Sequence, residues 1–427
     1  MSNSRVPVVP DCQLEGKVVL IRMDHNVVKK GKIKDTMRID RSIPTLQRIL
    51  KAGGLPIVMT HVGRPKDKQT GKITMSEDDA VTPIVKYLDE QLSLKGFVPQ
   101  MQAQDEFGIT DLSPLADAVV KLKSGEAGYV YLPNTRWFKG EEAKDGTEDV
   151  FAKDLASYAD LYVNDAFGSW QPHASTYSIT KYLPSYAGLL MMAEIENLDA
   201  VLQPKRPMVA VVAGAKFDTK IGPLSSLIKT CDYLVLGGVI YNAWLAHKYG
   251  LKIKGVGEED IAQAAKFAAE IGEKASRIIE PKVVVESDSF DERTDGSWRF
   301  VKPAELEAGT ELGYILDAAP VAFTDQKIKD VFMQASTIFI NAVMGLTSLF
   351  DEGTAAMYSL IDQNKKALKI YGGGDTIQDF KTLLPEIFAA ASKDDSYYFF
   401  TGGGAVLNAI EQGSPYGMKP VEALIEK

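Results

Sequence analysis

The chain has 427 residues, a net charge of -9 at pH 7, and 25% charged residues. A chain of this length usually divides into two domains, and its acidic balance argues against general nucleic-acid binding, which needs a basic surface. The two cysteines, Cys12 and Cys231, lie far apart, and no apolar run reaches about 18 residues, so we expect a cytoplasmic protein without a disulfide framework or a membrane span.

Short apolar runs alternate with helix-length segments along the whole chain. The ten predicted strands are Val18–Ile21, Pro56–Met59, Tyr129–Leu132, Leu161–Val163, Met208–Val212, Tyr233–Leu236, Lys282–Val285, Thr337–Ile340, Leu368–Tyr371 and Tyr397–Phe400. Predicted helices include Glu77–Gln91, Asp260–Ala275 and Asp375–Ala390. This alternation predicts parallel sheets covered by helices on both faces. Because ten strands are too many for one sheet, we predict an α/β fold with two Rossmann-like three-layer domains.

One amphipathic segment, Ala187–Leu202, lies near the middle of the chain and is followed by Pro204 and Pro207. We interpret it as a long helix that links the two domains, with the prolines marking the start of the second. An ordinary surface helix is the alternative, since periodicity does not separate the two cases.

Polar residues follow the predicted strands of the N-terminal half. Ligands of open parallel sheets bind beyond the carboxyl ends of the strands, and guanidinium groups bind carboxylates and phosphates with two parallel hydrogen bonds. The residues gathered in this way are Arg22, Asp24, Asn26, Arg38, His61, Arg64 and Arg136. They predict a pocket for a small, highly anionic substrate. The alternative is that some arginines pair with acidic neighbours for structural reasons, and Arg22 is the first candidate for that role.

Glycines follow the predicted strands of the C-terminal half. These segments are Ala213–Lys220, Gly237–Gly238, Gly372–Thr376 and Thr401–Gly404, with Asn341 after a further strand. Bare backbone at the start of a helix suits phosphate oxygens, and Asp375 could hold a divalent cation that shields them. A tight strand-to-helix turn capped by Asp375 is the alternative. An anion pocket on one domain and a glycine-lined site on the other suit phosphoryl transfer by domain closure across a cleft.

Several separated motifs resemble the phosphoglycerate kinase family, and together they span nearly the whole chain. They are Arg22–Asn26 (Arg-Met-Asp-His-Asn for the family's Arg-Val-Asp-Phe-Asn), Thr60–Pro65, Leu132–Phe138, Tyr162–Gly168, Gly214–Lys220, Gly372–Thr376 and Thr401–Ala405. The resemblance implies an acid-substrate domain at 1–188, a linker helix at 189–203 and a nucleotide domain at 204–404, with residues 405–427 packing back onto the first domain. It also implies reversible phosphoryl transfer between 1,3-bisphosphoglycerate and ADP, giving 3-phosphoglycerate and ATP, in glycolysis or carbon fixation.

The resemblance also implies a role for individual residues. The acid substrate would be held by Asp24, Asn26, Arg38, His61, Arg64, Arg136 and His173. The nucleotide would be held by Gly214, Lys216, Lys220, Gly237, Gly238, Asn341, Gly372, Gly373, Gly374, Asp375 and Thr376, with Mg²⁺ on Asp375. The catalytic residues would be Arg38, Lys220, Gly373 and Gly403. The expected partners are these small molecules, without nucleic acid or membrane, and the expected state is a monomer.

Four segments depart from the family pattern. The loop Gly168–His173 is one residue shorter and lacks the family's arginine, so His173 is the residue that could restore positive charge. Near Ser348 the acid expected at the ribose is replaced, and Asp351 or Glu352 could take its place. The other two departures are Leu316–Pro320 and Gly404–Asn408. Two alternative hypotheses follow: a weak or inactive relative that binds an anionic metabolite, and an active transferase with a different acyl phosphate or nucleotide.

Overall fold

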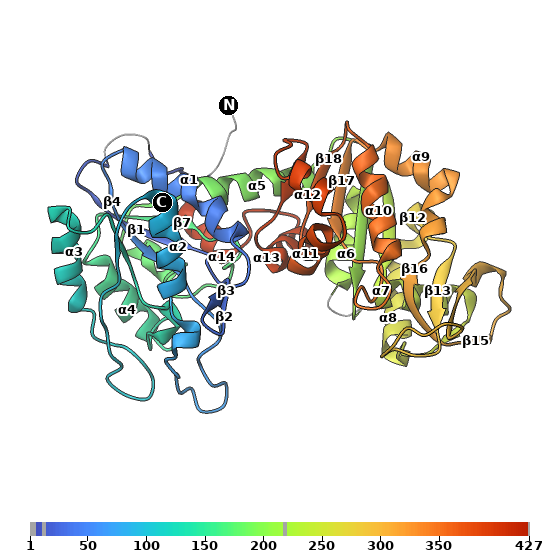
Figure 1. The fold of residues 1–427 in the computed structure, drawn as a ribbon, viewed down its shortest axis with the longest axis horizontal. Helices are drawn as coiled ribbons and strands as arrows, with labels where there is room; N and C mark the ends of the chain where they lie inside the picture. The colour runs from blue at the N-terminus through green and yellow to red at the C-terminus, as the bar shows by residue number, and fades with distance from the viewer. Residues whose placement is uncertain (1–5, 11–13, 217–219, 426–427) are drawn as a thin grey trace. The chain divides into compact units, whose positions relative to one another are not determined.

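The computed structural model describes residues 6–10, 14–216 and 220–425. The chain forms two compact units, one comprising Met1–Ile195 with Tyr416–Lys427 and the other comprising Glu196–Pro415. Each unit is built around a six-stranded parallel sheet with helices packed on it (Figure 1). Within the described part of the chain, every helix is too short or too polar to cross a bilayer.

The sheet of the first unit has the order β5-β6-β4-β1-β7-β8. Its strands are β1 (Val18–Met23), β4 (Leu55–Met59), β5 (Gly96–Phe97), β6 (Tyr129–Tyr131), β7 (Leu161–Asp165) and β8 (Ser185–Ala187). The central strand β1 is buried at every residue and pairs in parallel with β4 on one side and β7 on the other. The chain moves outward from β1 to β4 on one side and from β7 to β8 on the other, so the strand order reverses between β1 and β7. Open parallel sheets bind ligands at such a reversal.

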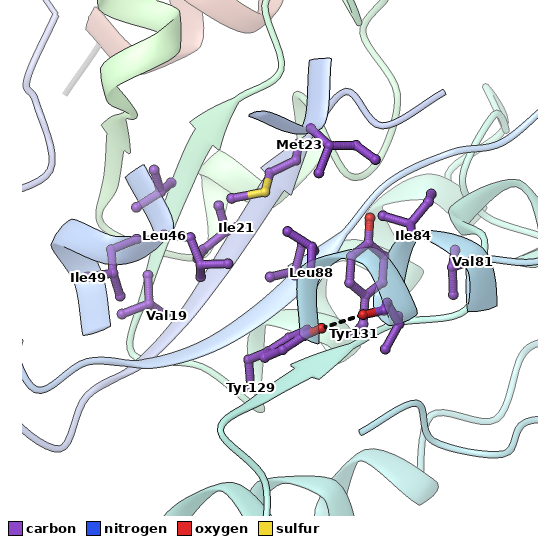
Figure 2. Packing of buried hydrophobic residues seen from close by; sticks show 14 of the residues in the cluster. Val19, Ile21, Met23, Leu46, Ile49, Val81, Ile84, Leu88, Tyr129 and Tyr131 are labelled. Carbon is purple, nitrogen blue, oxygen red and sulfur yellow. Dashed lines mark hydrogen bonds between the residues drawn. The ribbon is translucent and has the colours of Figure 1, made fainter. Parts of the chain in front are cut away.

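Alternate residues of β1 form one side of the core of this unit. Val19, Ile21 and Met23 are fully buried and pack with residues of α1 (Met37–Lys51) and α2 (Thr82–Leu92), as Figure 2 shows. Because side chains along a strand alternate between faces, the neighbouring residues of β1, including Arg22, are directed to the other face. The remaining long helices of the unit are α3 (Pro114–Ser124) and α4 (Thr147–Ala156).

The sheet of the second unit has the order β12-β10-β9-β17-β18-β19. Its strands are β9 (Met208–Gly214), β10 (Tyr233–Gly237), β12 (Ile278–Ile279), β17 (Thr337–Asn341), β18 (Leu368–Tyr371) and β19 (Tyr397–Phe399). Its helices include α6 (Ile221–Thr230), α7 (Gly238–Tyr249), α9 (Gln326–Gln334), α10 (Glu352–Gln363) and α13 (Gly403–Gln412). The order reverses between β9 and β17, whose adjacent ends at Val212 and Asn341 mark the second ligand-binding edge.

The prediction of an α/β fold with parallel sheets is confirmed, but one predicted strand lies outside both sheets. Lys282–Val285 corresponds to β13 (Val284–Ser287), which pairs antiparallel with β14 (Trp298–Val301) and β16 (Tyr314–Ala318). A short apolar run predicts a strand without identifying its neighbours, so the pattern could not show that this strand belongs to a separate small sheet.

Three predicted helices extend beyond the observed ones. Glu77–Gln91, Asp260–Ala275 and Asp375–Ala390 correspond to α2, to α8 (Glu258–Ile271) and to the pair α11 (Gly374–Leu383) and α12 (Pro385–Ala391). Pro385 divides the last prediction because proline lacks an N–H donor and disfavours a helical residue before it. Gly272, whose φ is +52°, ends α8.

The helix that joins the units is α5 (Leu189–Leu202), which begins two residues after the start predicted for it because residues up to Ala187 form β8. Its first turn is anchored in the first unit by two hydrogen bonds: Leu189 N donates to Thr45 Oγ1 at 2.9 Å, and Met191 N donates to Asp165 Oδ1 at 3.0 Å. Near the C-terminus, α14 (Lys419–Ile425) belongs to the first unit, whereas residues 405–415 belong to the second. The domain limits inferred from the family remain a prediction.

Candidate active site

Three residues expected to bind the acid substrate lie beyond the end of β1. Arg38, in the first turn of α1, places Nη1 3.3 Å from Asp24 Oδ2. The other oxygen of Asp24, Oδ1, is buried and has no hydrogen-bond partner among the described residues. Asn26 Oδ1 accepts from the backbone N–H of Gly63 at 3.0 Å, which joins the loops after β1 and β4. The structure therefore brings Asp24, Asn26 and Arg38 into one corner of the first unit.

Arg22 is turned into the protein and is completely buried. Its Nε donates to Ser175 Oγ at 2.8 Å, and Ser175 Oγ donates to Glu141 Oε1 at 2.6 Å. Its Nη2 lies 2.9 Å from His61 Nδ1, and because a guanidinium only donates, this imidazole nitrogen accepts. These contacts support the structural role considered for Arg22. Burial and Arg22 lower the pKa of His61 well below its ordinary value, so His61 is neutral.

The remaining arginines of the pocket, Arg136 and Arg64, differ in whether they already pair with an acidic residue. Arg136 donates through Nη1 to Gly63 O and places Nε 2.9 Å from Glu142 Oε1, so it is already engaged. Arg64 is exposed and forms no ion pair with any residue that the structure describes. It lines a cavity of about 820 Å³, whose other charged lining residues are Lys29, Lys30, Lys34, Asp78 and Asp79. Arg64 is therefore the arginine of this pocket best placed to receive an anion without breaking an existing pair.

His173 does not supply the charge that the shortened loop lacks. Its Nε2 lies 3.9 Å from Glu142 Oε1, and burial lowers the pKa of the imidazole, although Glu141 and Glu142 act in the opposite direction. At neutral pH this side chain is therefore uncharged. The expectation that His173 replaces the family's arginine as a positive charge is not supported, and its role in substrate binding stays a prediction.

The glycine-rich segments of the second unit bring two helix N-termini together. Gly373 has a φ of +107°, which an L side chain rarely adopts, and a Cβ there would lie 2.7 Å from Asn341 Nδ2. A Cβ on Gly403 would lie 2.6 Å from Gly373 Cα. Since α11 begins at Gly374 and α13 at Gly403, their free N–H groups start side by side. Paired helix N-termini with bare backbone suit the oxygens of a phosphate.

Lys220 stands beside this pair of helices. Its Nζ donates to Asn341 Oδ1, and Asn341 Nδ2 donates to Gly372 O at 2.6 Å. Burial lowers the pKa of the Lys220 ammonium to about 8, while the nearby Asp375 acts to raise it. Asp375, in the first turn of α11, and Lys216 are both exposed. Thr376 is buried. Phe217–Thr219, between the two lysines, lie outside the described residues.

Gly237 and Gly238 form a second patch of bare backbone, at the end of β10. Gly238 has a φ of +61°, and a Cβ there would lie 3.0 Å from Gly214 O, at the end of β9. A Cβ on Gly237 would lie 3.0 Å from Met344 Sδ. The backbones of the two strand ends therefore approach so closely that side chains are excluded. Whether this patch receives a nucleotide base remains a prediction.

The shortened loop after β17 has an acidic neighbour that sequence reasoning missed. Glu352 is paired with Arg293 at 2.8 Å, and Arg293 in turn lies over Phe350, so Glu352 is already engaged. The acidic neighbour of this loop is Asp379 in α11, because Thr347 Oγ1 donates a hydrogen bond to Asp379 Oδ2 at 2.8 Å. The sequence contained a signal for Asp379, which lies four residues after Asp375, since residues four apart share one face of a helix.

The two α/β units each carry strand ends whose side chains or bare backbone could receive an anion, as a phosphotransferase requires. Comparisons with known proteins agree. A family model described as phosphoglycerate kinase matches residues 9–413, and the chain belongs to the phosphoglycerate kinase family. The phosphoglycerate kinase of Methylorubrum extorquens is 36% identical over 85% of this chain and 87% of its own length. The phosphoglycerate kinase of Trichodesmium erythraeum is 34% identical over 88% of this chain and 90% of its own length.

Solved structures show the same fold. The structure of phosphoglycerate kinase from Coxiella burnetii covers 99% of this chain and 98% of its own, with a TM-score of 0.75 and 27% identity. That from Pyrococcus horikoshii OT3 covers 97% and 98%, with a TM-score of 0.72; at 21% identity it supports the fold alone.

Proposed function

We propose that this protein transfers a phosphoryl group reversibly between 1,3-bisphosphoglycerate and ADP, giving 3-phosphoglycerate and ATP. Besides the family membership, the observation that carries this proposal is the Lys220 ammonium beside the paired N-termini of α11 and α13. Phosphoryl transfer depends mostly on positioning and on neutralising the charge of the moving group, and a lysine among backbone N–H groups supplies both.

The acid substrate would bind in the first unit. Arg64 would contribute a free guanidinium, and Arg38 would exchange part of its pairing with Asp24 for the anion. Asn26, His61, Arg136 and His173 would complete the pocket as neutral or already paired groups. Because the two ligands bind to different units, the proposed transfer requires closure of the units on both substrates, which also excludes water from the transferring group.

Magnesium would be held by Asp375 together with nucleotide phosphates. Among the described residues no group of three or more His, Cys, Asp or Glu side chains could hold a metal ion by itself. Mg²⁺ keeps several waters and usually takes one or two carboxylates along with substrate phosphates, so the exposed carboxylate of Asp375 in the first turn of α11 suits it. When bound, the ion neutralises phosphate charge. Gly214, Lys216, Gly237, Gly238, Asn341, Gly372 and Thr376 would line the rest of the nucleotide site.

We further propose that the protein works as a cytoplasmic monomer in glycolysis or carbon fixation. The cysteine usage and the family pattern support this setting. The similarity to relatives named phosphoglycerate kinase favours this reaction, and none of the findings favours the alternative of a weak or inactive relative.

A coupled assay tests the reaction. Purified protein is supplied with 3-phosphoglycerate, Mg²⁺ and, in turn, each of the common nucleoside triphosphates. We expect turnover with ATP, and Lys220→Ala should lower kcat by about 100-fold or more while weakening ATP binding far less. A folded sample that is silent with every nucleotide would overturn the proposal. Equal losses of kcat and of ATP affinity in Lys220→Ala would reject only the role given to Lys220, and not the proposed reaction.

A further inference from the structure

A buried histidine lies between two of the acid-binding residues. His25 separates Asp24 from Asn26, is completely buried, and makes hydrogen bonds to three different elements. Its backbone N–H donates to Thr60 Oγ1, just after β4, at 2.9 Å. Its ring places Nδ1 2.8 Å from Tyr131 Oη in β6 and Nε2 2.7 Å from Ser42 Oγ in α1. The quoted family motif has phenylalanine at this position, and phenylalanine makes neither ring contact.

The hydrogen-bond partners determine which ring nitrogen carries the proton. Ser42 Oγ lies 2.7 Å from the carbonyl oxygen of Ile39, which only accepts, so the hydroxyl hydrogen of Ser42 is used there. Nε2 of His25 must therefore donate its hydrogen to Ser42 Oγ. Tyr131 Oη then donates to the unprotonated Nδ1. The ring is neutral, in agreement with burial, which lowers the pKa of His25 to about 3.

This chain of hydrogen bonds reaches α1, the helix that carries Arg38, which is expected to act at the transferring group. Ser42 lies one turn after Arg38 on α1, so the bond from His25 fixes the first turns of that helix to the loop after β1. The same loop carries Asp24, whose carboxylate lies 3.3 Å from Arg38 Nη1. Two ties, one through Asp24 and one through His25 and Ser42, therefore hold α1 against this loop.

We propose that His25 is a positioning residue, which acts through Ser42 and α1 to hold the Arg38 guanidinium beside the acid-substrate pocket. This inference rests on the proposed function, because it assumes that Arg38 contacts the transferring phosphoryl group. Catalysis that depends on placing a rigid guanidinium is sensitive to shifts of about 1 Å, so loosening α1 reduces the rate even when the protein stays folded.

Two substitutions separate the two ring contacts. In His25→Gln the amide nitrogen occupies the position of Nε2 and keeps a donor for Ser42, whereas in His25→Asn the amide group reaches only the position of Nδ1. We expect His25→Asn to lower kcat by about tenfold and His25→Gln to stay within about twofold of the unmodified protein. Tyr131→Phe is the matched control, since it removes the Nδ1 contact alone. It should lower the unfolding free energy and leave kcat within about twofold.

A double-mutant cycle with Ser42→Ala tests the connection. Ser42→Ala should lower kcat as much as His25→Asn does, and the double variant should lose no more than either single one. Calorimetric titration with 3-phosphoglycerate gives a second measure, in which His25→Asn should bind more weakly and Tyr131→Phe normally. Equal effects of His25→Asn and Tyr131→Phe on kcat and affinity would show a purely structural role. If the unmodified protein itself shows no turnover, the proposed function fails, and the titration still tests the positioning of Arg38.

Discussion

Lys220 carries the positive charge on which the proposed phosphate site depends most, and burial lowers the pKa of this ammonium. The ammonium is present below its pKa of about 8 and is lost as the pH rises through that value. We therefore expect kcat/KM for ATP, which reports the free enzyme, to fall above pH 8. In Lys220→Arg this decrease should move upward by more than one pH unit, because a guanidinium stays charged. Profiles between pH 6 and 10, each normalised to its own maximum, provide the measurement.

The pH dependence of kcat gives an internal control for that prediction. Bound phosphates stabilise the ammonium, so the decrease in kcat, which reports the complex, should begin at a higher pH than the decrease in kcat/KM. An alkaline limb that is the same in the unmodified protein and in Lys220→Arg would assign the titration to another group.

At the residue scale the sequence predicted which kinds of side chain the proposed site contains, but not their charge states. Arginines and glycines at strand ends were sufficient to predict an anion pocket and a phosphate site. The inward turn of Arg22 depends on Ser175, which is distant in the chain, and the neutrality of His173 depends on its burial. Neither partner nor burial can be read from a local motif, so these two properties required the structure.

The N-termini of α11 and α13 form the proposed phosphate site, and Gly374 at the start of α11 allows a selective test. A Cβ at Gly374 would meet no heavy atom within 4 Å, so Gly374→Ala should leave the unfolding free energy unchanged. If phosphates approach this backbone closely, the added methyl group should weaken ATP binding by about tenfold. Isothermal titration and denaturant unfolding on the same sample measure both quantities.

Gly257, at the N-terminus of α8, provides a matched control for Gly374. Its φ is -78° and a Cβ there would come no closer than 3.8 Å to Asp260, so the added methyl group fits, and the residue lies outside the proposed site. Because Gly257 is the N-cap of α8 and alanine is a poorer N-cap than glycine, Gly257→Ala should lower the unfolding free energy slightly and leave ATP affinity unchanged. Normal ATP affinity in Gly374→Ala would show that the nucleotide does not approach the start of α11.

The start of α5 depends on a buried carboxylate whose pKa is shifted. Burial raises the pKa of Asp165 from 3.8 to about 6, so the folded state holds its proton more tightly than the unfolded chain does. Stability from this group is therefore greatest below pH 3.8 and declines as the pH rises through 6. Over this interval the decline amounts to about 3 kcal/mol, at about 1.4 kcal/mol for each pH unit.

Asp165→Asn removes that titration while keeping an oxygen for the N–H of Met191. Urea unfolding at pH 4 and at pH 7.5 should therefore show the variant gaining stability relative to the unmodified protein as the pH rises. Asp67, an exposed carboxylate, offers a comparison: Asp67→Asn should show no such relative gain. Parallel curves for Asp165→Asn and the unmodified protein would mean that the carboxylate is ionised at both pH values or at neither.

At the scale of elements, both parallel sheets were predictable because alternating apolar runs and helices have a direct physical cause. The position of β13 was not, since an apolar run of three valines is compatible with any sheet. The break between α11 and α12 had a local signal in Pro385 that the helical periodicity outweighed. Local chemistry thus determined the ends of elements more reliably than periodicity did.

For the whole molecule, the separation of the two sites makes a thermodynamic prediction. Residues proposed to bind the acid belong to the first compact unit, whereas those proposed to bind phosphates belong to the second. Each unit has its own sheet and core, so binding of one ligand alone should depend on one unit. Transfer should depend on both, because it requires the two ligands together.

Arg64→Ala and Gly374→Ala test this division. In binary titrations Arg64→Ala should weaken 3-phosphoglycerate binding by about tenfold or more, because it removes a charged hydrogen-bonding partner. It should leave ATP affinity within about twofold, and Gly374→Ala should show the reverse. Turnover should fall in both variants, and in the combined variant the loss in kcat/KM should equal the product of the single losses, since the two residues belong to different compact units and are expected to act independently. If either single variant lost affinity for both 3-phosphoglycerate and ATP, the two units would not bind their ligands separately. Each binding site would then contain residues of both units.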